Sequence, residues 1–123
     1  MPETNTMILT TTIASGSSLS GVIDMSAFAL NKDNYRLFGI VMPSAWTAAN
    51  LTFQASYDGG TTWVNVWDAT GDEMSVIADA NRWIALIPDA LSAISFLKIR
   101  SGSSSSAVNQ ASDRTLTLIL RSY

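Results

Sequence analysis

The 123-residue chain contains neither histidine nor cysteine. Without an imidazole, it lacks the side chain that most often acts as a general base near neutral pH and as a metal ligand. Without a thiol, it can form no disulfide, no thiolate nucleophile and no structural zinc site of the usual kind. These two absences argue against an enzyme, so we expect no catalytic residue, no metal and no cofactor.

Charged residues are also scarce: they make up 14% of the chain, and the net charge is −3. An acidic chain with scattered basic residues repels phosphate, so we expect no nucleic-acid partner. No apolar run approaches the ~20 residues of a membrane-spanning helix, so we expect no membrane partner. Hydrophobic residues nevertheless reach 47%, which argues against a disordered chain.

Short segments of alternating apolar and polar residues follow one another along the chain, separated by turn residues. In the last of them, Leu116, Leu118 and Leu120 alternate with polar or β-branched neighbours. The pattern is typical of an all-β protein with eight or nine short strands. The predicted strands cover residues 7–14, 19–25, 35–42, 51–57, 62–67, 74–78, 82–87, 95–100 and 114–122.

The connections between these segments are too short for parallel crossovers, so the strands are expected to pair antiparallel. The expected fold is an antiparallel β-sandwich, jelly-roll-like, formed by residues 7–123 after a polar N-terminal arm of residues 1–6. Residues 26–34 are assigned to a loop, and the Ser-rich stretch 101–113 to a long loop inside the domain. The serine run at residues 103–106 is expected to be flexible and exposed. The predicted core contains Leu9, Ile13, Leu37, Val41, Leu51, Phe53, Trp63, Ile84, Leu97, Ile99, Leu116, Leu118 and Leu120.

The most specific local pattern is SYDGGTTW, which covers residues 56–63. It resembles the Asp-box, S-x-D-x-G-x-T-W, of sialidases and other β-propellers, in which the Asp and Gly shape a hairpin turn and the Trp packs beneath it. A single copy implies a stable hairpin and no glycosidase activity. We expect a positive φ at one of the glycines and a bond from the Asp to the backbone. The hairpin residues are Ser56, Asp58, Gly59, Gly60, Thr62 and Trp63.

Four tryptophans, at positions 46, 63, 67 and 83, allow two interpretations. Trp63 and Trp67 are four residues apart on one predicted strand, so they share a face, as in a platform on which sugars stack. Large aromatic side chains also fill cores and protein interfaces, and we favour this second interpretation.

Four carboxylates lie close together in sequence: Asp68, Asp72, Glu73 and Asp79. They lack the spacing of a calcium loop and the positioned neighbours of a catalytic pair. We therefore expect a solvated turn, with a weak cation site as the alternative.

Read over most of its length, the chain resembles small proteins encoded in the head-gene region of tailed bacteriophages. The resemblance lies in the order of segments: a Thr-rich first strand at residues 8–13, a Gly/Ser turn, and then residues 35–63, 82–91 and 97–121. Proteins of this class that are understood are capsid decoration or cement proteins, small β-sandwiches on the outside of the shell and often oligomeric. The resemblance implies a virion protein made in the bacterial host cytoplasm, with the major capsid protein and further copies of itself as partners.

Strand edges and exposed apolar side chains are the expected contact surfaces. Phe96 shares a strand face with Lys98 and Arg100, and Trp46 falls in a loop, so we expect both aromatic side chains to be exposed. The candidate interface consists of Met1, Pro2, Glu3, Thr4, Asn5, Thr6, Trp46 and Phe96. The alternative function is a carbohydrate-binding β-sandwich, such as a virion adhesin for host-surface glycans.

Overall fold

The computed structural model describes residues 6–25, 35–91 and 93–122. The predictions for residues 1–5 and for the loop at residues 26–34 lie outside these ranges. Nine strands and a short 3-10 helix, η2 (Pro88–Leu91), are present in the described residues. The strands are β1 (Thr6–Ile13), β2 (Ile23–Asp24), β3 (Tyr35–Val41), β4 (Leu51–Ser56), β5 (Val64–Asn65), β6 (Ser75–Val76), β7 (Trp83–Ala85), β8 (Phe96–Ser101) and β9 (Arg114–Ser122).

Each strand lies inside or within one residue of a predicted segment, which confirms the all-β prediction. Thr6, predicted to end the polar arm, is instead the first residue of β1 and pairs with Arg121. The strands β2, β5, β6 and β7 are shorter than the predicted segments, because ladder pairing occupies only part of each extended run.

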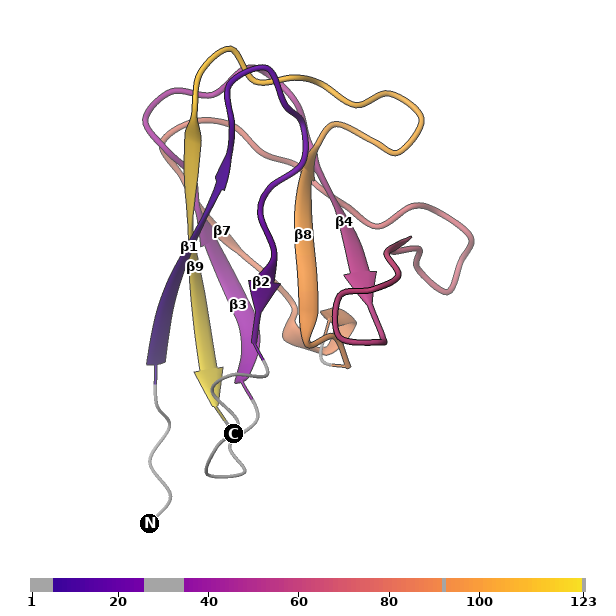
Figure 1. Ribbon diagram of the computed structural model, residues 1–123. Coiled ribbons are helices and arrows are strands. Elements are labelled where there is room, and N and C mark those ends of the chain that lie inside the picture. Colours follow the sequence, from indigo (N-terminus) through magenta and orange to yellow (C-terminus); the bar gives the residue numbers. More distant parts are fainter. Residues whose placement is uncertain (1–5, 26–34, 92, 123) are drawn as a thin grey trace.

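The strands form two antiparallel sheets that pack face to face, as Figure 1 shows. One sheet has the order β1-β9-β3-β7, and the other has the order β2-β8-β4-β5 with β6 also paired to β4. The pairs β1–β9, β2–β8, β3–β7 and β4–β5 are nested, so the chain is wound as one long hairpin rolled into two sheets. This winding is that of a jelly roll.

The core lies between the two sheets and is built from the inward side chains of each alternating strand. Leu116, Leu118 and Leu120 of β9 are fully buried, and they meet Phe53 of β4 and Ile99 of β8 in one cluster. Burial of these side chains is the main force that holds the sheets together.

Two residues predicted for the core, Val41 and Trp63, are half-buried and lie outside the core cluster. Val41 is displaced because the pairing of β3 with β9 shifts between Leu37 and Gly39. The extra residue reverses the alternation, so that Leu37 and Ile40 face inward while Val41 faces outward. Leu9 and Ile84 are also only half-buried, but they pack against the core.

Leu118→Ala is expected to lower the free energy of unfolding by about 2–5 kcal/mol, because it opens a cavity at a fully buried position. The matched control is Ile8→Ala on the neighbouring strand, where the side chain is 63% exposed and the change should be within about 0.5 kcal/mol. Urea denaturation measures both values. Equal effects at the two positions would contradict the assignment of the inward face.

Candidate functional site

The turn between β4 and β5 is built by two polar side chains. Ser56 Oγ donates to Asp58 Oδ1 at 2.7 Å and accepts the Gly60 N–H at 2.8 Å. Asp58 Oδ1 also accepts the N–H groups of Thr61 and Thr62, at 3.1 and 2.8 Å. The two oxygens therefore close the turn from inside and replace the strand hydrogen bonds that are missing there.

Gly59 and Gly60 have φ angles of +75° and +98°, a conformation that side-chain-bearing residues rarely adopt. The Trp63 indole N–H donates to the Gly60 carbonyl at 3.0 Å, so the ring packs against the turn as the Asp-box resemblance implies. Lys98 Nζ lies 4.5 Å from the centre of the Trp63 ring, which places this tryptophan on the outer face of the sheet and not in the core.

Hydrogen bonding lowers the pKa of Asp58 from its usual 3.8 to about 2. The largest contributions come from Thr62, whose backbone and side chain both bond to the carboxylate, followed by Ser56. These groups stabilise the ionised form, so the turn is strongest when Asp58 is charged.

The side chain of Arg100 is buried although it lies on the outer face of the sheet. Its Nη1 donates to Thr52 Oγ1 and to Glu73 Oε2, each at 3.3 Å, and its Nη2 donates to Asn65 Oδ1 at 2.7 Å. The Glu73 carboxylate also accepts the Ser104 N–H at 3.0 Å. One ion pair thus fastens the segment after β5 and the Ser-rich loop onto β8 and β4.

This ion pair corrects the prediction that all four clustered carboxylates form a solvated turn. The Glu73 side chain is only 12% exposed, and that of Arg100 8%. Asp68 does stay in an exposed turn, where it accepts the N–H groups of Thr70 and Asp72. The sequence did not indicate which of the four carboxylates meets a buried cation, because the contact joins residues 27 positions apart.

The Ser-rich loop is fastened to the sandwich at both ends. Next to β8, the Gly102 N–H donates to the Asn50 carbonyl at 2.8 Å and the Gly102 carbonyl accepts Thr52 Oγ1 at 2.7 Å. Near β9, the Gln110 side chain is buried and exchanges two bonds with the Thr47 backbone, at 2.8 and 3.0 Å. Between these ends, residues 104–106 of the serine run are exposed, as predicted, while Ser103 is half-buried.

The two tryptophans expected to share a face differ in exposure, since Trp67 is exposed and Trp63 is half-buried. Trp46 is half-buried, packs against the core and donates from its indole to the Ala49 carbonyl at 3.0 Å. Trp67 and Trp83 are 57% and 62% exposed, but Trp67 follows β5 in one sheet and Trp83 belongs to β7 in the other. Trp63 is half-buried beside Lys98.

The exposure expected for Trp46 and Phe96 is wrong, since both side chains are half-buried. Phe96 does share the outer face with Lys98 and Arg100, as its pairing with Ser56 requires. Substitution of Trp46 would disturb core packing as well as any contact, so Trp46 is a poor probe of an interface. Of the arm residues, only Thr6 lies in the described part of the chain.

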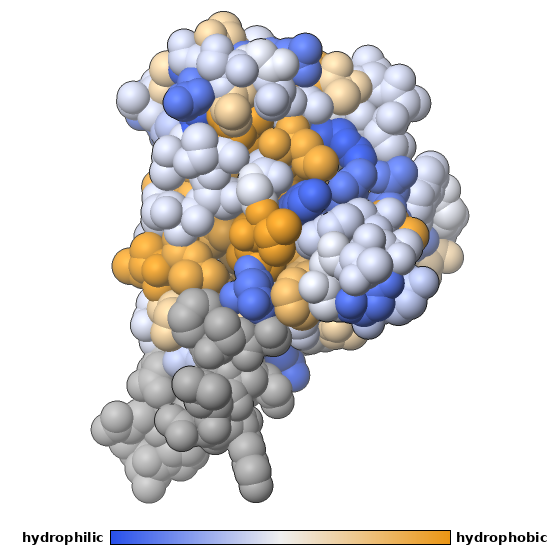
Figure 2. Space-filling model, in the orientation of Figure 1, coloured by the Kyte–Doolittle hydropathy of each residue, from blue (hydrophilic) through white to orange (hydrophobic). Residues whose placement is uncertain are grey.

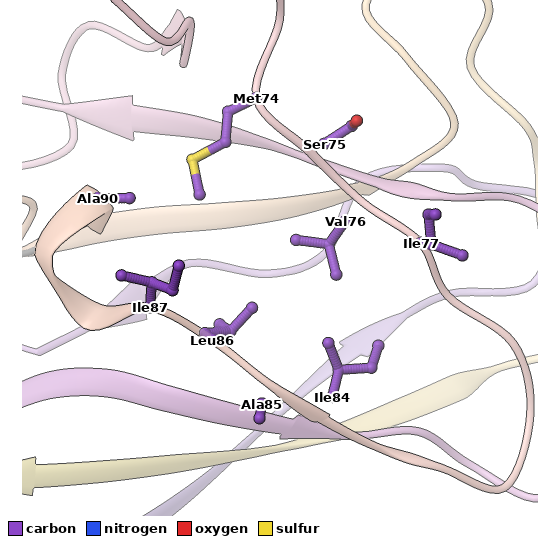
Figure 3. A pocket seen from close by; sticks show the side chains of 9 residues that line it. All are labelled: Met74, Ser75, Val76, Ile77, Ile84, Ala85, Leu86, Ile87 and Ala90. Carbon is purple, nitrogen blue, oxygen red and sulfur yellow. The ribbon is translucent and has the colours of Figure 1, made fainter.

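An apolar groove of about 440 Å³ opens between the sheets where β6 and β7 form their edges. Figure 3 shows side chains from the segments around these two strands and from η2 directed into this space. The lining residues are Met74, Ser75, Val76, Ile77, Ile84, Ala85, Leu86, Ile87 and Ala90.

The groove was not predictable from the sequence, because its position depends on which edges the two sheets leave open. The one available signal is the segment RWIALI at residues 82–87, which is apolar on both faces. Elsewhere the surface is mixed: Figure 2 shows hydrophobic residues over the middle of the face viewed there and polar residues toward its upper end.

Asp58→Asn is expected to lower the stability of the fold at neutral pH. Since the pKa of Asp58 falls from 3.8 to about 2 on folding, its contribution is present above pH 4 and is lost as the pH falls through about 2. The difference in unfolding free energy between the wild type and Asp58→Asn should therefore shrink between pH 4 and pH 2. A difference that stays constant over this range would contradict the role of the charged carboxylate.

Glu73→Ala should lower the unfolding free energy by about 3–5 kcal/mol, because it leaves the buried Arg100 guanidinium without its counter-charge. The double variant Arg100→Met/Glu73→Leu should regain most of that loss, since it leaves no unpaired charge. Urea denaturation of the three proteins tests the pair. A double variant less stable than Glu73→Ala would contradict this explanation.

Among residues 6–25, 35–91 and 93–122, no group of three or more acidic side chains lies close enough together to hold a metal ion. Within the same ranges no helix has the length and hydrophobicity needed to cross a membrane. No family model matches the chain, and no curated protein or solved structure is significantly similar to it.

Proposed function

We propose that this protein is a structural module that binds the outer surface of a tailed-phage capsid and stabilises the shell. The observation that carries the proposal is that polar and apolar side chains differ in where they lie and what they contact. Polar groups that could perform chemistry are occupied in holding loops to the sandwich, while several large apolar side chains stand exposed on strands and turns.

Rigidity supports this function. Every buried side-chain nitrogen and oxygen in the described part of the chain has a hydrogen-bond partner. Arg100 and Gln110 each tie a loop to a strand through several bonds. A scaffold held in this way loses little conformational entropy when it binds, which favours a protein whose task is attachment.

The β4–β5 hairpin offers a contact surface. It carries Tyr57, Val64 and Trp67, which are 81%, 49% and 57% exposed. The Ser56–Asp58 bonds fix the turn beside them. Exposed aromatic side chains on a rigid support are the residues that most often dominate protein interfaces.

The fold and the order of sequence segments also support binding to a capsid. Jelly rolls are frequent in viral capsid domains, although the same fold occurs in lectins, so this support is by analogy. Of the exposed tryptophans, Trp67 follows β5 of one sheet and Trp83 lies in β7 of the other. This separation favours a protein partner over the alternative of a glycan.

The proposal predicts that Tyr57→Ser/Trp67→Ser weakens binding to capsids at least tenfold, since two anchors of ordinary interface strength are removed. Capsids of the phage that encodes the protein, purified without it, are mixed with each variant and sedimented. Ile8→Ser, at a 63% exposed position on β1, is the matched control and should bind as the wild type does.

Deletion of residues 1–5, the part of the predicted arm that precedes β1, should also weaken binding in this assay. Full binding by the hairpin variant would remove the hairpin from the interface. Absence of the protein from purified virions would contradict the function itself. Retention on a glycan array without binding to capsids would favour the carbohydrate alternative.

A further inference from the structure

Within the part of the chain that the structure describes, β7 ends the first sheet and has a strand neighbour on one side only. It pairs with β3 alone, and the Leu86 N–H donates to the Phe38 carbonyl while the Met42 N–H donates to the Arg82 carbonyl. Since antiparallel partners alternate between bonded and non-bonded pairs, residues 82, 84 and 86 direct their backbone toward β3. The backbone groups of Trp83 and Ala85 therefore point to the open edge.

The other strand edges are shorter than β7 or partly covered. The second half of β1 is covered by residues 19–21: Ile13 bridges to Ser20, and the Gly21 N–H lies 3.3 Å from the Thr12 carbonyl. The ladders of β2, β5 and β6 span two residues each. The strand β7 pairs over three residues, Trp-Ile-Ala, and contains no lysine, proline or bulge, which are features that protect edges from pairing.

Apolar side chains flank this open edge. Ile77, Trp83 and Ile87 are 76%, 62% and 78% exposed, and Ile77 and Ile87 line the groove of Figure 3. The described side chains that line the groove are uncharged. The nearby Asp79 and Arg82 lie 3.6 Å apart and offset each other, so this pair adds no net charge to the edge.

We propose that the occupant of this edge is a second copy of the same chain, paired antiparallel through β7 about a two-fold axis at Ile84. Each Trp83 then lies opposite Ala85 of the other copy, and the two residues exchange backbone hydrogen bonds. The result is one continuous sheet of eight strands across two sandwiches, with the exposed isoleucines covered at the junction.

The side chains on the outer face fit this register. Gly39 leaves room for Trp83, because a Cβ there would lie 2.6 Å from the indole Nε1. Trp83 is thus held over its own sheet, and the small Ala85 of the second copy stands opposite it. Because the Trp83 ring is drawn back over Gly39 of β3, it leaves the open edge clear, and the backbones of Trp83 and Ala85 can meet their counterparts twice across the axis. This symmetry is the reason for naming a second copy and not an unrelated peptide.

Sedimentation of the purified protein at increasing concentration tests the proposal without any capsid. The wild type should form a dimer. Ile87→Lys, which places a charge at the junction, and Ala85→Pro, which removes an N–H directed at the open edge but none directed at β3, should each weaken dimerisation at least tenfold. Ile8→Lys, on the opposite edge strand of the same sheet, should dimerise like the wild type.

Amide hydrogen exchange locates the contact. Protection of the Trp83 and Ala85 amides should rise with protein concentration in the wild type and in Ile8→Lys, and should not rise in Ile87→Lys. A wild type that stays monomeric, or a dimer that Ile8→Lys disrupts and Ile87→Lys does not, would overturn the proposal. Neither result bears on the proposed capsid binding, which is tested separately by sedimentation with capsids.

Discussion

The pairing of β1 with β9 is the constraint on which the rest of the structure depends. It joins residues 6–13 to residues 114–121 in an unbroken register, so the two ends of the described chain lie side by side. This ladder sets which face of β9 turns inward, and with it the positions of Leu116, Leu118 and Leu120 in the core. The remaining strands form nested pairs inside this outermost one, which produces the jelly roll.

Sequence periodicity was sufficient to predict the strands and most of the core, because a half-buried strand must alternate and its turns must contain glycine or polar residues. The Asp58 turn was predictable for the same local reason. Features that depend on contacts between distant residues were not predictable from the sequence. The burial of Arg100 under Glu73, the shift that turns Val41 outward and the groove between β6 and β7 depend on which segments meet after folding.

The structure separates the polar from the apolar side chains in a way that bears on function. Buried polar groups such as Arg100 and Gln110 are satisfied by strands and loops of the chain itself. Exposed apolar groups gather on the β4–β5 hairpin and along the open edge at β7. We propose that the hairpin surface contacts the capsid and that the edge at β7 pairs with a second copy.

The central claim is that this protein acts by attachment to a capsid, and electron microscopy of intact virions tests it most directly. The account predicts density for a nine-stranded sandwich on the outer surface of the shell, with the β4–β5 hairpin against the capsid protein. Virions of the encoding phage that show no such density, and from which the protein is absent, would contradict it.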